Sequence, residues 1–153
     1  MCFSMVVQIV LLLIFGITLF HLHLPSSSDK WIRFVLLTLL GTLTATILGI
    51  AFSAVPKTGK GASAVVSPVV IILQFFSGVF FIFTQLPHWM QQVAAIFPLK
   101  WLTQGMREVF LPDSFASQEV AKSWETGRGL LINGIWLIIG VALAAKTFRW
   151  DRE

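Results

Sequence analysis

The chain has 153 residues, of which 56% are hydrophobic and 12% charged, and its formal net charge is +4. An average soluble domain carries about 25% charged residues, so this composition excludes an ordinary soluble globule and indicates lipid as the solvent. The eleven basic residues are scattered along the chain and do not form one basic face, which argues against a nucleic-acid partner.

The first apolar stretch covers about residues 3–24, and no Asp, Glu, Lys or Arg precedes Asp29. A helix of about 20 residues is long enough to cross the hydrocarbon core. The stretch has neither a basic N-terminal region nor an Ala-x-Ala-like cleavage site, so we interpret it as a retained span and not as a signal peptide. A tight polar turn is predicted at residues 25–29.

The second apolar stretch, about residues 33–55, carries a small residue at every fourth position. These residues are Gly41, Ala45, Gly49 and Ser53. A ridge of this kind lets two helix backbones approach closely, so we predict helix packing there. The partner helix could belong to the same chain or to a second subunit.

The third apolar stretch, about residues 64–86, contains Gln74 near its middle. A polar group in hydrocarbon needs a partner, so Gln74 is expected to form a hydrogen bond with a neighbouring helix. The alternative is a place on a substrate path.

The segment between residues 87 and 127 contains two proline-started, amphipathic stretches, 87–97 and 98–110. Both are too short to span, so they are predicted to form a pair of re-entrant or interfacial helices, followed by an exposed polar segment. A fourth span is expected at about 128–146. The sequence therefore predicts an all-α, polytopic membrane protein with four transmembrane helices in one membrane domain, 1–153.

The loop between the second and third stretches contains Lys57 and Lys60 and no acidic residue. By the positive-inside rule this loop and the basic C-terminal tail are cytoplasmic, which places residues 25–31 and 87–127 outside.

Catalytic motifs are missing from the sequence: there is no nucleophile elbow, no Walker-type phosphate loop and no pair of intramembrane carboxylates. His21 and His23 are two positions apart and would point in different directions on a helix, so no metal site is predicted. We therefore expect neither an enzyme nor a cofactor in this chain.

Three motifs follow one another in the second half of the chain: Phe-Phe-Ser-Gly-Val-Phe-Phe at 75–81, Gln-Leu-Pro-His-Trp at 85–89 and Ala-Ala-Ile-Phe-Pro-Leu at 94–99. This run resembles the signature region of type-2 ABC exporter permeases of the multidrug and daunorubicin-resistance kind. The residues that carry the resemblance are Ser77, Gly78, Phe80, Phe81, Leu86, Pro87, Trp89, Pro98 and Arg107. Ile82 stands where that family usually has proline, and the resemblance extends over about residues 35–153.

The resemblance implies a six-span subunit of which this chain would carry the last four spans. It further implies a second permease copy, two ATPase subunits that hold the ATP, and a place in the inner (plasma) membrane. The expected activity is the outward movement of a drug, lipid or glycan-type substrate.

In the resembled family, cytoplasmic loops dock on the ATPase. Here that role would fall to Lys57, Thr58, Gly59 and Lys60, and the alternative for this loop is an anchor that contacts only lipid headgroups. For the chain as a whole, the alternatives are a small non-transporting membrane scaffold and a truncated, non-functional fragment. A membrane enzyme is disfavoured because the sequence has no catalytic set.

Overall fold

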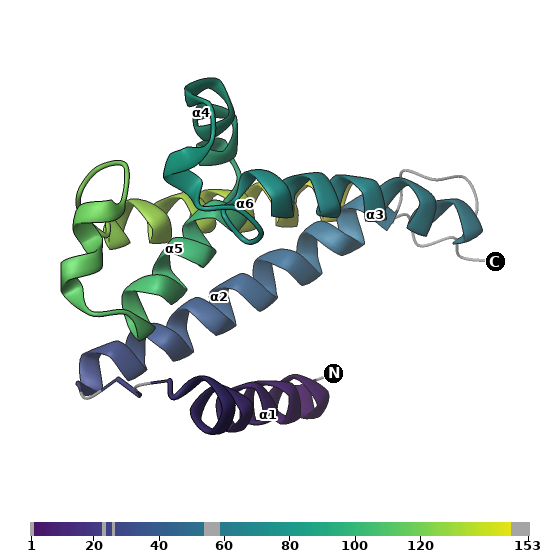
Figure 1. The fold of residues 1–153 in the computed structure, drawn as a ribbon. Coiled ribbons are helices and arrows are strands. Elements are labelled where there is room, and N and C mark those ends of the chain that lie inside the picture. Colours follow the sequence, from purple (N-terminus) through teal and green to yellow (C-terminus); the bar gives the residue numbers. More distant parts are fainter. Residues whose placement is uncertain (1, 23, 26, 54–58, 148–153) are drawn as a thin grey trace.

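The structure, a computed structural model, describes residues 2–22, 24, 25, 27–53 and 59–147 (Figure 1). Within these ranges every regular element is helical. The elements are α1 (Cys2–Phe20), α2 (Ser28–Ser53), α3 (Gly59–Phe76), η1 (Phe83–Gln85), α4 (His88–Ile96), α5 (Pro98–Phe110), η2 (Asp113–Gln118) and α6 (Thr126–Thr147). The expected all-α membrane protein is confirmed.

Helices α2, α5 and α6 pack against one another and form the core of the fold. α2 and α6 run in the same direction, and α5 lies against both near the end where they begin (Figure 1). A small residue brings the two long helices together, because a Cβ atom added to Gly140 would lie 2.9 Å from Cγ2 of Ile47.

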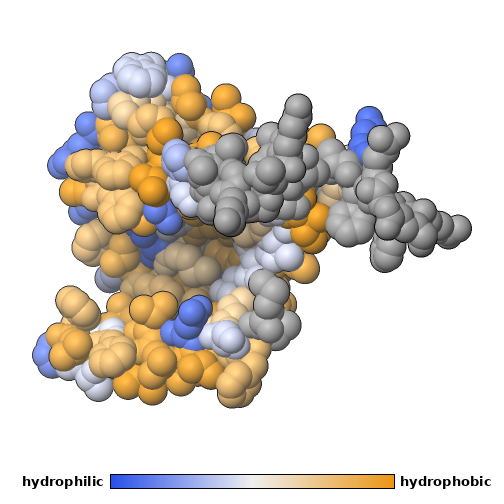
Figure 2. Space-filling view, turned by 90° about the vertical axis from the view of Figure 1, so that its right-hand side faces the viewer, coloured by the Kyte–Doolittle hydropathy of each residue, from blue (hydrophilic) through white to orange (hydrophobic). Residues whose placement is uncertain are grey.

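Helix α1 is attached to this core only loosely. None of the residues of its apolar window, Phe3–Phe20, is buried. A cavity of about 420 Å³ lies between α1, α2 and α5, lined among others by Met5, Thr38 and Phe110. Figure 2 shows the hollow above α1, which forms the lower part of that view, and shows hydrophobic residues over much of the surface. Such a surface fits contact with lipid.

The third span differs from its prediction. We expected one helix over about 64–86, but α3 ends at Phe76, and only its part Val66–Phe76 is described as apolar helix. Three other helices, α1, α2 and α6, are long and apolar enough to cross a membrane. The hydropathy remains high after Phe76, but Gly78 takes a φ of +78° and turns the chain away.

The start of the second span also differs from its prediction, because the expected turn at 25–29 is partly helical. α2 begins at Ser28, five residues before the predicted start of the span. The Ser27 hydroxyl accepts the backbone N–H of Asp29 at 3.3 Å, and Asp29 adds a negative charge in the first helical turn, where the helix dipole favours it. Lys30 and Arg33 therefore lie on the first turns of α2.

The predicted pair of short helices is present as α4 and α5. Pro87 immediately precedes α4, and Pro98 is the first residue of α5. Proline suits these positions because the first helical N–H groups have no partner within the helix. α5 is the more amphipathic and the more buried of the two helices, and it carries the polar site described next.

Candidate functional site

One face of α5 is polar and buried. Lys100, Gln104 and Glu108 follow one another at intervals of four, so they lie along the same side of the helix. Their exposed fractions are 4%, 1% and 4%. Buried polar groups require hydrogen-bond partners, and the partners here come from three other parts of the chain.

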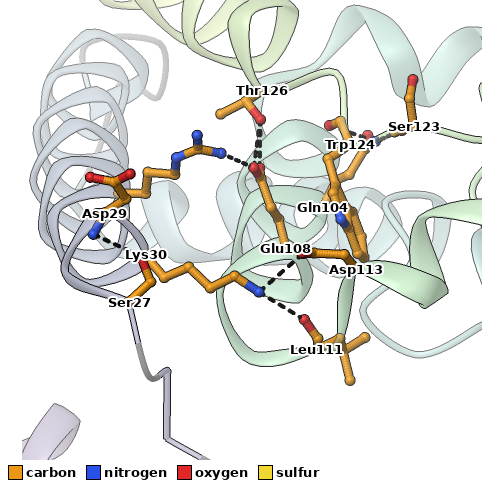
Figure 3. A network of polar contacts seen from close by, with 11 residues as sticks. Ser27, Asp29, Lys30, Gln104, Glu108, Leu111, Asp113, Ser123, Trp124 and Thr126 are labelled. Atoms are coloured by element: carbon orange, nitrogen blue, oxygen red, sulfur yellow. Dashed lines mark hydrogen bonds and ion pairs between the residues drawn. The ribbon is translucent and has the colours of Figure 1, made fainter.

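Glu108 connects α5 to both long helices of the core (Figure 3). Its carboxylate accepts hydrogen bonds of 2.8 and 2.7 Å from the hydroxyl of Thr126, the first residue of α6. It also forms an ion pair with Arg33 of α2. One carboxylate therefore joins the beginnings of α2 and α6 to α5.

A second ion pair lies beside the first. Lys30 of α2 contacts Asp113 Oδ1 at 3.1 Å and donates to the carbonyl of Leu111 at 3.3 Å. The Asp113 side chain is 82% exposed, so water screens this pair far more than it screens the pair between Arg33 and the buried Glu108 carboxylate.

Gln104 and Lys100 continue the polar face. The Gln104 amide donates to the carbonyls of Trp124 at 3.0 Å and Ser123 at 3.4 Å. Lys100 Nζ donates to Gln104 Oε1 at 2.5 Å and lies 3.5 Å from the ring centroid of Trp101. A cation at this position interacts favourably with the indole face.

The electrostatics of Lys100 are unusual. Burial lowers the pKa of Lys100 from 10.5 to about 8, although the nearby carboxylates of Glu125 and Glu119 act in the opposite direction. The Trp101 ring and the Gln104 side-chain carbonyl replace part of the hydration that the Lys100 ammonium group loses on burial.

Three residues of the family-like motif are brought together around the turn after α3. Arg107 Nε donates to Glu119 Oε1 at 2.8 Å, and a guanidinium N–H reaches the carbonyl of Gly78 at 3.5 Å. Thr103 donates to the carbonyl of Ser77 at 2.8 Å. A Cβ atom on Gly78 would lie 3.3 Å from Arg107 and 3.1 Å from Phe83, so glycine suits both the backbone conformation and the space.

The remaining motif residues lie at the surface or at helix starts. Phe80 and Phe81 are exposed, and their rings contact Phe75 at centroid distances of 5.1 and 5.7 Å. The carbonyl of Leu86 accepts the Gln91 side chain at 2.8 Å, and Trp89 is exposed on α4. Pro87 and Pro98 have the helix-starting positions given above.

The predicted small-residue ridge makes a close contact at Gly41 and not at Gly49. A Cβ atom on Gly41 would lie 3.0 Å from Leu102 of α5, whereas one on Gly49 would meet nothing within 4 Å. Ala45 and Gly49 are exposed and line an apolar groove of about 270 Å³ between α2, α3 and α5. Within this chain, the close contact is therefore made at Gly41 and not at Gly49. The side chain of Ser53 lies outside the described residues.

The other predicted site residues are less well defined. Gln74 is half-buried on α3, and it is not one of the residues that line this groove. Lys57 and Thr58 lie outside the described residues. Gly59 and Lys60 begin α3, and the Lys60 side chain is not described.

The sequence did not predict that one group of polar residues is connected: Lys30, Arg33, Lys100, Gln104 and Glu108. The spacing of four between the last three was visible, and so was the fact that α5 is too short to span. The partners of these residues lie up to 83 positions away in sequence, however, so their convergence could not be predicted from the pattern.

One of the comparisons with known proteins gives a match. Residues 1–146 match the model of a family described as ABC-2 family transporter protein. Neither the curated proteins nor the solved structures include a match to the chain.

Proposed function

Because the chain belongs to the ABC-2 family of transporter proteins, we propose that it exports a drug, lipid or glycan-type substrate with energy from ATP. Membership makes it the membrane permease of an ABC transporter and implies an ABC ATPase as partner. The observation that carries this conclusion is the family match, which covers nearly the whole chain.

Transport gives the direct test. Inside-out vesicles that contain this chain and its ATPase should accumulate a fluorescent amphipathic drug, a labelled lipid or a labelled glycan when ATP is added. Vesicles with an ATPase variant that cannot hydrolyse ATP are the control. If the ATPase binds the chain but none of these three substrate classes moves, the proposed export function is wrong.

Transport requires that the spans move relative to one another. Glu108 joins α5 to Arg33 of α2 and Thr126 of α6, which supports the proposal that these three helices move as one body. The groove between α2, α3 and α5 has almost no polar lining and offers a surface along which α3 can slide. The ATPase would then drive this body against α3.

The proposed location is the inner (plasma) membrane, with several crossings. In Figure 1, α2 and α6 run in the same direction and α3 runs against them, so α2 and α6 end on the side where α3 begins, which supports the proposed topology. Single cysteines at Lys57 and Ser117, in a Cys2→Ser background, test this. An impermeant maleimide added to intact cells should label position 117 and leave position 57 unlabelled. The reverse pattern would invert the proposed topology.

The loop with Lys57 and Lys60 is proposed to dock on the ATPase. The basic, acid-free sequence supports this role, because lysine can pair with carboxylates of the partner. Lys57→Glu/Lys60→Glu should insert normally but reduce co-purification of the ATPase, whereas Lys122→Glu, on the exposed segment after η2, should not. Full ATPase binding by the double variant would leave only the lipid-anchor role for this loop.

A second copy of the permease is proposed to pack on α2. The support is the exposed small-residue pair Ala45 and Gly49, which lines part of the apolar groove. Gly49→Leu should reduce the pull-down of an untagged copy by a tagged one. Gly134→Leu is the matched control, because a Cβ atom there also meets nothing within 4 Å. Equal pull-down by both variants would show that the second copy does not contact α2 at Ala45 and Gly49.

A further inference from the structure

A cavity of about 360 Å³ lies beside the turn that follows α3. Its wall is formed by residues 78–84, and its other side by Arg107, Phe115, Glu119 and Trp124. These residues come from α5, from η2 and from the segment before α6, at the end of the molecule where α2 and α6 begin (Figure 1). The cavity therefore lies at one end of the long helices, where a membrane surface would lie.

The charges at this cavity are balanced. Arg107 and Glu119 both line it and form an ion pair of 2.8 Å, so they present one positive and one negative group side by side. A ligand with both charges can contact each of them, whereas a ligand with only a negative charge is repelled by Glu119.

The edge of the cavity is apolar and exposed. Phe80, Phe81 and Ile82 line it and are 61%, 54% and 64% exposed. Three consecutive exposed apolar side chains on a membrane protein mark a surface that contacts acyl chains.

We propose that this cavity binds the headgroup of one zwitterionic phospholipid. The phosphate oxygens accept hydrogen bonds from the Arg107 guanidinium, and the ammonium group lies near Glu119. The acyl chains follow Phe80, Phe81 and Ile82 into the bilayer. This site does not depend on the export function, because it requires only that the chain lies in a membrane.

The first test counts bound lipid. Native mass spectrometry of the full chain in detergent should show retention of phosphatidylethanolamine above that of phosphatidylglycerol or diacylglycerol. Arg107→Gln removes the guanidinium that donates to the phosphate, so it should weaken phosphatidylethanolamine binding about fivefold, as expected for the loss of one hydrogen bond. Arg128→Gln, which removes an ion-paired guanidinium outside the cavity, should leave binding unchanged.

A second variant avoids any folding problem that the loss of the Arg107 contacts causes. Phe80→Ser changes a side chain that is 61% exposed and should also weaken phosphatidylethanolamine binding. If Arg107→Gln and Phe80→Ser both bind like the wild type, or if diacylglycerol binds as well as phosphatidylethanolamine, the proposal is overturned.

The second test examines the ion pair between Arg107 and Glu119. Glu119→Gln leaves Arg107 without its carboxylate, so the preference should reverse and phosphatidylglycerol should bind more tightly than phosphatidylethanolamine. An unchanged preference would mean that Arg107 and Glu119 do not contact the headgroup, and the assignment of the headgroup to this cavity would fail.

Discussion

Helix α1 has 19 residues and no charged side chain, yet none of its residues 3–20 is buried. Helix α5 has 13 residues, and among the six that it buries are Lys100, Gln104 and Glu108. In a water-soluble protein the apolar helix would be buried and these polar side chains would be exposed. In a bilayer an apolar side chain loses nothing by facing lipid, whereas a polar one must find a partner inside the protein. Specific contacts within the protein therefore position α5, whereas α1 is stabilised mainly by its contact with lipid.

The largest expected effect comes from removing the centre of the α5 network. Glu108→Ala leaves Arg33 and Thr126 without their shared acceptor, and we expect the free energy of unfolding to fall by about 3 kcal/mol. Asp113→Ala removes the exposed partner of Lys30 and should cost at most about 0.5 kcal/mol. Titration with a denaturing detergent measures both, and equal losses would show that the buried network stabilises no more than a surface ion pair.

The second-largest loss of stability is expected from a steric change at Gly105. A Cβ atom on Gly105 would lie 2.6 Å from Leu37 Cδ1, and Leu37 is itself buried, so Gly105→Ala should destabilise by about 2 kcal/mol. Gly49→Ala meets no atom and improves helix propensity, so it should have no cost. The same titration decides, and loss of stability in Gly49→Ala would show a contact on α2 beyond those within this chain.

The protonation of Lys100 gives a pH-dependent test. Below pH 8 the lysine is charged in both the folded and the unfolded state. Between about pH 8 and 10.5 the unfolded chain binds a proton that the folded chain lacks, so the free energy of unfolding should rise with pH. Lys100→Met should lose this rise, whereas the exposed control Lys122→Met should keep it. A wild-type stability that falls over this range would contradict the assigned direction.

The smallest expected effect lies on α1. Leu12 is 71% exposed, so Leu12→Ala should change the free energy of unfolding by less than about 0.5 kcal/mol. Val109, on α5, is 2% exposed, and Val109→Ala should cost about 1–2 kcal/mol through the cavity that it leaves. If Leu12→Ala costs as much as Val109→Ala, α1 is packed against protein in the detergent-solubilised state.

Much of the fold followed from local patterns. The apolar stretches predicted α1, α2 and α6, and Pro87 and Pro98 predicted the starts of α4 and α5, because both signals depend on neighbouring residues. The end of α3 at Phe76 was missed. Hydropathy is high on both sides of Gly78, and only the positive φ of that glycine shows that the chain turns there.

The sequence by itself determined that the protein is helical, that lipid is its solvent and that its motifs resemble those of ABC permeases, since composition and short motifs are properties of the linear chain. Only the tertiary structure decided which polar groups meet. Glu108 contacts Arg33 and Thr126, and Trp124 shares a cavity with Gly78 and Arg107, because α2, α5 and α6 pack at one end of the fold. Contacts between residues far apart in the sequence depend on helix packing angles, and no local pattern specifies those.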